Sequence, residues 1–245
     1  MAKAGRGLLA VKTVADVAKL PTLLADRRAL DRTSDVPGIL RRLCRPAGKS
    51  HIVADQVPGE IEGLAALVAE RRPSVVVEIG TSKGGTLYLW SRLAREGALV
   101  VSIDMPNFSF GSVRAVNRWV YRGFGAARGV EVRPLAADSH APETRAELER
   151  ILAGRAVDFL FIDGDHSYAG VKADFEAYGR LMAPDGIVAF HDIAFPPGGW
   201  IDVQRFWREV ERGPHRTRTF VADGPEPRGI GVVFLGERRV PVPAG

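Results

Sequence analysis

The chain has 245 residues, of which 46% are hydrophobic and 26% are charged, and its formal net charge is +5. This length and composition fit one globular domain with a sizeable core and a small appendage. The basic residues are scattered and form no stripe interleaved with aromatic residues, so we expect no nucleic-acid partner. The only cysteine, Cys44, excludes an internal disulfide and an all-cysteine zinc site.

The N-terminal stretch MAKAGRGLLAVKTVADVAKL resembles a signal peptide only briefly, because Lys12, Asp16 and Lys19 interrupt its apolar part. We interpret it as an amphipathic helix. No apolar run in the sequence approaches the ~18–20 residues of a membrane span, so we expect a cytoplasmic protein without stable membrane insertion. Residues 1–57 are predicted to form a helical cap without recognisable chemistry, and they offer a surface for assembly into a homo-oligomer.

From residue 58 onward, helical and extended patterns alternate. Strands rich in Val, Ile and Phe are predicted at 74–80, 98–104, 130–135, 157–164 and 186–192. Helices are predicted at 84–96, about 111–122, 142–153, 167–182 and about 200–212. Strands without polar alternation are typical of a parallel sheet covered by helices on both faces. Two further extended segments, 217–223 and 230–236, predict an antiparallel hairpin. The expected fold class is a doubly wound, mostly parallel α/β sheet over residues 58–245.

Acidic side chains end nearly every predicted strand. They are Glu78, Asp104, Asp138, Asp163 and Asp192. Ligands of an open parallel sheet bind at the carboxyl ends of its strands. A single acid at such a place is as well explained by capping of the next helix, but a series along one edge favours a binding site.

The stretch VVVEIGTSKGGT, residues 75–86, places glycines after the first strand, where a ligand can lie close against the backbone. Its spacing lacks the G-x-G-x-x-G of dinucleotide-binding folds and the Gly-Lys-Ser/Thr end of a phosphate-binding loop. We expect the ligand to lie against Gly80, Thr81, Ser82 and Gly84, where the next helix offers N–H groups to a carboxylate or a phosphate. Glu78 suits a cationic amine.

Two later acids suit a nucleoside. Asp104 can accept both hydroxyls of a ribose, and Asp138 is placed to accept the amino group of an adenine. An amino-acid end and a nucleoside end together describe S-adenosylmethionine. Asp104 also suits NAD, so an NAD(P)-dependent oxidoreductase stays open as an alternative at this point.

Four segments together resemble the class I S-adenosylmethionine-dependent methyltransferases. They are VVVEIGTSKGGT, SID (102–104), AADS (136–139) and FIDGDHSYAGVKADFEAYGRLMAPDGIVAFHD (161–192). Within that class they resemble the metal-dependent branch with cephalosporin-hydroxylase-like proteins and antibiotic sugar O-methyltransferases. The resemblance covers residues 56–235. It implies a Rossmann-like methyltransferase fold and methyl transfer to a hydroxyl of a small natural product or sugar.

The resemblance also implies which residues bind a metal and take part in methyl transfer. Asp163, His191 and Asp192 are expected to bind a divalent metal, with Asp163 also touching the cofactor, and His166 is expected to act as general base. The implied metal is Mg, with Mn or Fe as alternatives because some relatives have a carboxylate where this chain has His191. Asp165 is expected to cap the next helix. Three other readings stay open: a metal-free site, a His166 bonded to backbone, and a non-catalytic helper protein on the same fold.

Overall fold

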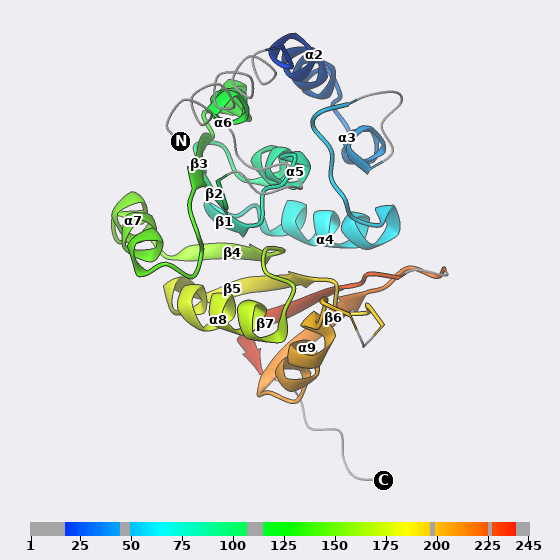
Figure 1. Ribbon diagram of the computed structural model, residues 1–245, viewed down its shortest axis with the longest axis vertical. Coiled ribbons are helices and arrows are strands. Elements are labelled where there is room, and N and C mark those ends of the chain that lie inside the picture. The colour runs from blue at the N-terminus through cyan, green and yellow to red at the C-terminus, as the bar shows by residue number, and fades with distance from the viewer. Residues whose placement is uncertain (1–17, 45–49, 107–114, 197–198, 225–226, 239–245) are drawn as a thin grey trace, which may run out of the picture.

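The structure is a computed structural model that describes residues 18–44, 50–106, 115–196, 199–224 and 227–238. Its centre is a seven-stranded sheet with the strand order β3-β2-β1-β4-β5-β7-β6 (Figure 1). The strands are β1 (Val75–Ile79), β2 (Leu99–Asp104), β3 (Glu131–Ala136), β4 (Val157–Ile162), β5 (Met182–His191), β6 (His215–Phe220) and β7 (Ile230–Arg238). Strands β1 to β5 pair in parallel, and β7 is antiparallel to both of its neighbours.

This topology confirms the predicted fold class. The predicted strands are all present, and their ends differ from the predicted ones by at most four residues. The antiparallel β7, inserted between β5 and β6, separates this sheet from the 3-2-1-4-5-6 order of dinucleotide-binding folds.

Helices cover both faces of the sheet, with α2–α6 on one side and α8 and α9 on the other (Figure 1). They are α2 (Leu20–Asp31), α3 (Val36–Cys44), α4 (Pro58–Arg71), α5 (Gly85–Leu93), α6 (Ala115–Tyr121), α7 (Pro142–Leu152), α8 (Tyr168–Tyr178) and α9 (Val203–Glu211). The first residues of the helix predicted at 111–122, residues 111–114, lie outside the described residues. No helix in the described ranges combines the length and the hydropathy needed to cross a membrane.

Two hydrophobic clusters follow from the alternation of strand side chains between the faces. Val76 of β1 packs into the cluster that contains α4, α5 and α6, whereas Val77 packs into the cluster that contains α7, α8 and α9. Buried residues of α2 and α3, such as Leu23 and Leu43, belong to the first cluster. The described part of the predicted cap therefore shares its core with the sheet, while its extent over residues 1–57 stays a prediction.

The order of the strands reverses between β1 and β4, and there the backbones lie unusually close. Gly80, directly after β1, has a φ of +94°, and a Cβ on it would lie 2.0 Å from the carbonyl oxygen of Asp163. The Asp163 N–H donates to the Ile79 carbonyl at 2.8 Å. Only glycine meets both requirements, so the residue sets the spacing of the two strand ends.

One buried carboxylate joins α4 to the loop of the C-terminal hairpin. Glu60 has no solvent exposure, and its two oxygens accept N–H groups from Ala222 at 3.1 Å and Gly229 at 2.9 Å. A charge-assisted hydrogen bond of this kind stabilises a buried backbone group more than a neutral one does.

We therefore expect Glu60→Ala to lower the free energy of unfolding by about 2–4 kcal/mol, since two backbone N–H groups lose their acceptor. Urea denaturation at neutral pH measures the change. Glu62→Ala, at an exposed position of the same helix, is the matched control and should stay within about 0.5 kcal/mol of the parent protein. Equal stabilities of the two variants would contradict this role for Glu60.

Candidate active site

The glycine stretch forms a tight turn between β1 and α5. The Gly84 N–H donates to the Thr81 carbonyl at 2.8 Å, and both Ser82 and Gly84 have positive φ angles of 45° and 76°. A Cβ on Gly84 would lie 2.5 Å from the Tyr121 ring. The buried Thr81 hydroxyl is hydrogen-bonded to the Ser102 hydroxyl of β2. The turn is therefore packed tightly, with the Tyr121 ring against Gly84, and its expected role in binding a ligand stays a prediction.

Glu78 is fully buried and bonded to protein on both oxygens. Trp90 of α5 donates its indole N–H to one oxygen at 3.0 Å, and the Ser102 hydroxyl donates to the other at 2.7 Å. Burial raises the pKa of Glu78 to about 8, and the hydrogen bond from Thr86 opposes that effect. The side chain fastens β1, β2 and α5 together, and the amine-binding role suggested by the sequence stays a prediction.

The two acids expected at the nucleoside end occupy different surroundings. Asp104 accepts the Ser82 N–H at 2.7 Å, and burial raises the pKa of Asp104 in spite of its backbone hydrogen bonds. It therefore ties the end of β2 to the glycine turn. Asp138 is half exposed and accepts the His140 N–H at 2.9 Å, in the loop after β3. Both acids lie past the carboxyl ends of neighbouring strands, and their ribose and adenine roles stay predictions.

The three residues expected to bind a metal come together at the ends of β4 and β5. Their ligand atoms all lie within 4.8 Å of one another. His191 Nδ1 is 2.9 Å from Asp163 Oδ1 and 3.5 Å from Asp192 Oδ1. Burial lowers the pKa of His191, but the two carboxylates, Asp163 foremost, outweigh it and raise that pKa to about 9. A charged imidazole thus offsets the repulsion between the two acids.

Once His191 has lost its Nδ1 proton, the same side chains fit a divalent cation. In an octahedral site with bonds of about 2.1 Å, neighbouring ligand atoms lie about 3.0 Å apart and opposite ones about 4.2 Å apart. The separations of His191 Nδ1 from the two carboxylate oxygens approach the first spacing. Asp192 Oδ1 is buried and has no hydrogen-bond partner among the described residues, so an acceptor is available. Two carboxylates and one imidazole suit Mn or Fe as well as Mg.

His166 and Asp192 form a second pair at this edge. His166 Nδ1 lies 2.6 Å from Asp192 Oδ2, and the histidine side chain is 22% exposed. Burial lowers the pKa of His166, but the hydrogen bond to Asp192 and the charges of Asp163 and Asp192 together outweigh it and raise that pKa above its usual value. Burial raises the pKa of Asp192, but His166, His191 and the nearby Arg228 bring it below its usual value. Asp192 therefore stays ionised and fixes the orientation of the His166 ring.

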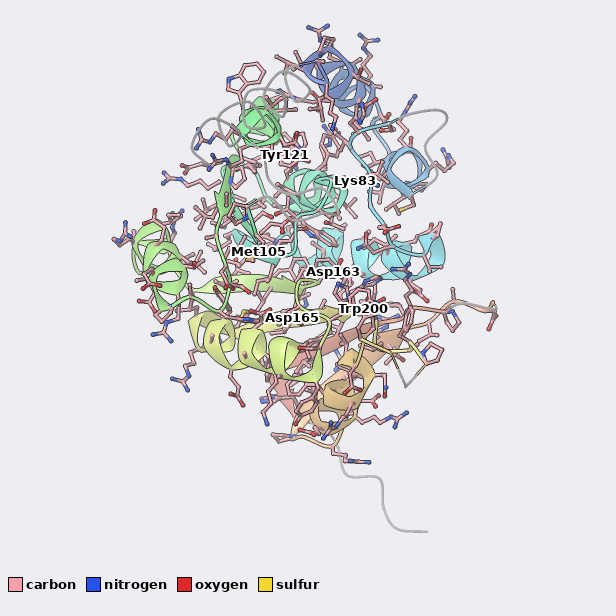
Figure 2. The ribbon with its side chains drawn as sticks, viewed as in Figure 1. Lys83, Met105, Tyr121, Asp163, Asp165 and Trp200 are labelled. Carbon is pink, nitrogen blue, oxygen red and sulfur yellow. The ribbon has the colours of Figure 1, made fainter. Side chains whose placement is uncertain are left out.

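Trp200, before α9, lies beside this pair. Its ring meets the His166 ring edge to face at a centroid distance of 5.3 Å, and it is 71% exposed. Figure 2 shows Trp200, Asp163 and Asp165 in the same part of the molecule. Asp165 accepts the Ser167 N–H at 2.9 Å. The N-cap of α8 is Ser167, whose hydroxyl accepts the Gly170 N–H at 3.0 Å, so the expectation that Asp165 caps this helix is wrong.

Two further residues at this site have no signal in the sequence. Gln56, in the segment before α4, donates its side-chain N–H to Asp163 Oδ2 at 2.7 Å. The expectation that residues 1–57 carry no chemistry overlooked this contact, because a lone glutamine before a helix belongs to no motif. Arg228 Nη1 lies 4.0 Å from Asp192 Oδ1, and its placement depends on the hairpin loop.

Comparison with protein families matches residues 77–193 to the family model described as "Methyltransferase domain". This segment of the chain is similar to methyltransferase domains. The matched segment runs from β1 to just past β5 and includes the glycine turn, Asp163, His166 and Asp192. The family match confirms the resemblance of the sequence to methyltransferases, and the solved structures described below share the fold.

The chain also matches part of a longer protein. "Uncharacterized protein y4gI" from Sinorhizobium fredii (strain NBRC 101917 / NGR234) is 27% identical over an alignment of 180 residues, and the match covers 70% of this chain. The chain spans 18% of the length of that curated relative. The match extends beyond the family segment but leaves most of y4gI without a counterpart.

Solved methyltransferases share the fold. The O-methyltransferase TomG from Streptomyces achromogenes, described as involved in tomaymycin synthesis and solved with S-adenosylmethionine, has a TM-score of 0.55, 18% identity and 88% coverage of both chains. The O-methyltransferase from Bacillus cereus, solved with S-adenosylhomocysteine, has a TM-score of 0.52 and 19% identity, covering 86% of this chain and 97% of its own. These likenesses establish the fold alone.

The burial of Glu78 predicts a pH dependence of stability. The folded state holds the Glu78 proton up to a pKa of about 8, whereas a glutamate exposed to water has a pKa near 4.5. This proton stabilises the fold below pH 4.5, and that stability is lost by about 1.4 kcal/mol per pH unit as the pH rises to about 8.

Glu78→Gln should remove this dependence of the free energy of unfolding on pH and make the protein more stable than the parent at pH 8.5. Urea denaturation between pH 5 and pH 9 measures it, with the exposed Glu62→Gln as control. A variant with the slope of the parent protein would refute the assignment.

Proposed function

We propose that this protein transfers a methyl group from S-adenosylmethionine to a hydroxyl group of a small natural product or sugar, with the help of a divalent metal. The observation that carries the proposal is the pairing of His166 with Asp192 directly beside the cluster of Asp163, His191 and Asp192. The match to methyltransferase domains supports S-adenosylmethionine as the cofactor. These side chains lie at the edge of the sheet where such folds bind ligands.

His166 acts as the base in this proposal. Its Nδ1 is bonded to Asp192, so Nε2 is the ring atom left to take a proton from the acceptor hydroxyl. As the proton moves to Nε2, the acceptor oxygen forms a bond to the methyl carbon and the carbon–sulfur bond breaks, which leaves S-adenosylhomocysteine. Asp192, held ionised, stabilises the resulting imidazolium.

A divalent cation would be held by Asp163, His191 and Asp192. When bound, such a cation lowers the pKa of a hydroxyl and fixes its position. The protein's own part is to hold the donor atoms at the spacings described above and to keep them from solvent, since His191 and Asp192 are almost completely buried.

The acceptor is proposed to be ring-shaped. Trp200 presents an exposed indole next to His166, and aromatic faces pack well against sugar or phenol rings. A vicinal diol or catechol would place a second oxygen near the metal-binding acids.

Two rival functions make different predictions about binding. An NAD(P)-dependent oxidoreductase would bind NADH, and a non-catalytic helper would bind cofactor without transferring methyl groups. Isothermal titration calorimetry of S-adenosylhomocysteine and of NADH with the purified protein distinguishes the proposed methyltransferase from the oxidoreductase. Heat from NADH with none from S-adenosylhomocysteine would overturn the proposed function.

Asp192→Ala should abolish the dependence of methyl transfer on divalent ions while S-adenosylhomocysteine still binds, because a metal ligand is lost and the cofactor contacts are kept. The measurement is the transfer rate with and without EDTA, next to the calorimetric Kd of the cofactor product. Asp165→Asn, which alters a nearby acid that faces α8, should keep the sensitivity of the parent protein to EDTA. Unchanged EDTA sensitivity in Asp192→Ala would refute the ligand assignment.

His166→Ala should slow transfer by about 10²–10⁴-fold, the usual contribution of a positioned base, without weakening cofactor binding. Single-turnover kinetics with saturating cofactor measure the rate. His215→Ala, on the edge strand β6, serves as the control and should transfer at the rate of the parent protein. A His166→Ala rate at that level would remove the histidine as base.

A further inference from the structure

One hydrogen bond links the N-terminal part of the chain to the candidate metal ligands. Gln56 Nε2 donates to Asp163 Oδ2 at 2.7 Å, across 107 residues of sequence. The other oxygen, Asp163 Oδ1, faces His191 Nδ1 at 2.9 Å. Asp163 therefore has one oxygen held by a neighbour and one oxygen turned toward the cluster.

Asp192 has the same arrangement. Its Oδ2 is held by His166 at 2.6 Å, and its Oδ1 lies 3.5 Å from His191 Nδ1. In each carboxylate, one oxygen is thus held by a hydrogen bond and the other oxygen is in position to bind a cation. Groups that hold the ligands of a metal in this way set their orientation and the affinity of the site.

We propose that Gln56 is a positioning residue that orients the Asp163 carboxylate for a divalent cation. This inference rests on the proposed metal-assisted function and deepens it, because it assigns to the N-terminal cap a part in building the site. Gln56 acts through Asp163 and does not itself touch the reacting atoms.

The segment that carries Gln56, residues 50–57 and here called the strap, is fixed at two points. The Ala54 N–H donates to the Leu43 carbonyl at 3.0 Å, and the Val53 carbonyl accepts the Gly85 N–H at 3.1 Å. A Cβ on Gly85 would lie 2.2 Å from the Ala54 nitrogen, so the strap lies directly against the start of α5. The strap therefore delivers the Gln56 amide to a defined place.

The surroundings of Gln56 argue against a role in stability. The residue is 8% exposed, and its Oε1 is buried without a donor among the described residues. Such an unsatisfied group costs about 1–3 kcal/mol. The amide cannot simply turn over, since Oε1 would then face a carboxylate oxygen. A leucine of similar size would avoid this cost but could not donate to Asp163.

The test is Gln56→Leu, with Mn²⁺ alone as the probe. The dissociation constant of Mn²⁺, measured by electron paramagnetic resonance of the free ion, should rise about 10–100-fold. S-adenosylhomocysteine should still bind, and the melting temperature should stay close to that of the parent protein, because removal of the unsatisfied Gln56 Oε1 offsets the donor that Asp163 Oδ2 loses. An unchanged Mn²⁺ affinity, or a lowered melting temperature in step with the loss of affinity, would overturn the proposal.

A control separates positioning from general support of the cap. Leu43→Ala removes a fully buried side chain next to the strap and should lower the melting temperature, as large core truncations do. It keeps the Gln56 amide, so Mn²⁺ affinity of the folded protein should be retained. Loss of Mn²⁺ affinity in both variants alike would mean that Gln56 only supports the cap.

A second perturbation moves the strap without touching Gln56. Gly85→Ala forces the strap away from α5 and should weaken Mn²⁺ binding as Gln56→Leu does. Gly59→Ala is its matched control, because a Cβ there meets only Ala222 at 3.9 Å, and it should bind Mn²⁺ like the parent protein. A Gly85→Ala protein with parental Mn²⁺ affinity would count against the strap.

Measurements on the parent protein show whether a negative result refutes the role of Gln56 or the proposed metal-assisted function. If it binds Mn²⁺ and Gln56→Leu binds it equally well, the role of Gln56 is refuted and the proposed function stands. If it binds S-adenosylhomocysteine but no Mn²⁺, the metal-assisted part of the proposed function is refuted, and this inference with it.

Discussion

The contact between two carboxylates and one imidazole at the ends of β4 and β5 is the constraint on which the rest of the site depends. Asp163 and Asp192 would repel each other if nothing positive stood between them. His191 supplies that charge in the structure, and its raised pKa follows from the same proximity. His166 and Gln56 each form a hydrogen bond to one of these two acids. Their chemistry is therefore a property of the group and not of single residues.

Backbone proximity is what brings these groups together. Gly80 allows β1 to lie against the end of β4, and Gly85 allows the strap to lie against α5. In both places the glycine faces another backbone, so a side chain would displace a whole segment. The glycine-rich stretch thus has a second role beside the expected one toward a ligand: it lets three separate segments of the chain meet at one edge of the sheet.

The sequence predicted the sheet and the convergence of Asp163, His191 and Asp192, because strand-end positions in a parallel sheet follow from hydrophobic patterns and strand order. It did not predict that Glu78 would be enclosed by Trp90 and Ser102, since the direction of a side chain depends on packing. Nor did it predict Gln56, whose contact with Asp163 depends on how the strap crosses α5. Tertiary contacts of single polar residues leave no periodic signal in a sequence.

The shared core of α2, α3 and the sheet has a consequence for how such a protein can evolve. A fold whose leading helices could be exchanged freely would allow recombination upstream of β1 to bring in new acceptor specificities. Here Leu43 lies in the same hydrophobic cluster as Val76, and the leading segment reaches as far as Asp163. A graft that begins at β1 would leave both an open apolar face and an unanchored acid, so descendants of this chain are expected to inherit the leading helices and the sheet as one unit.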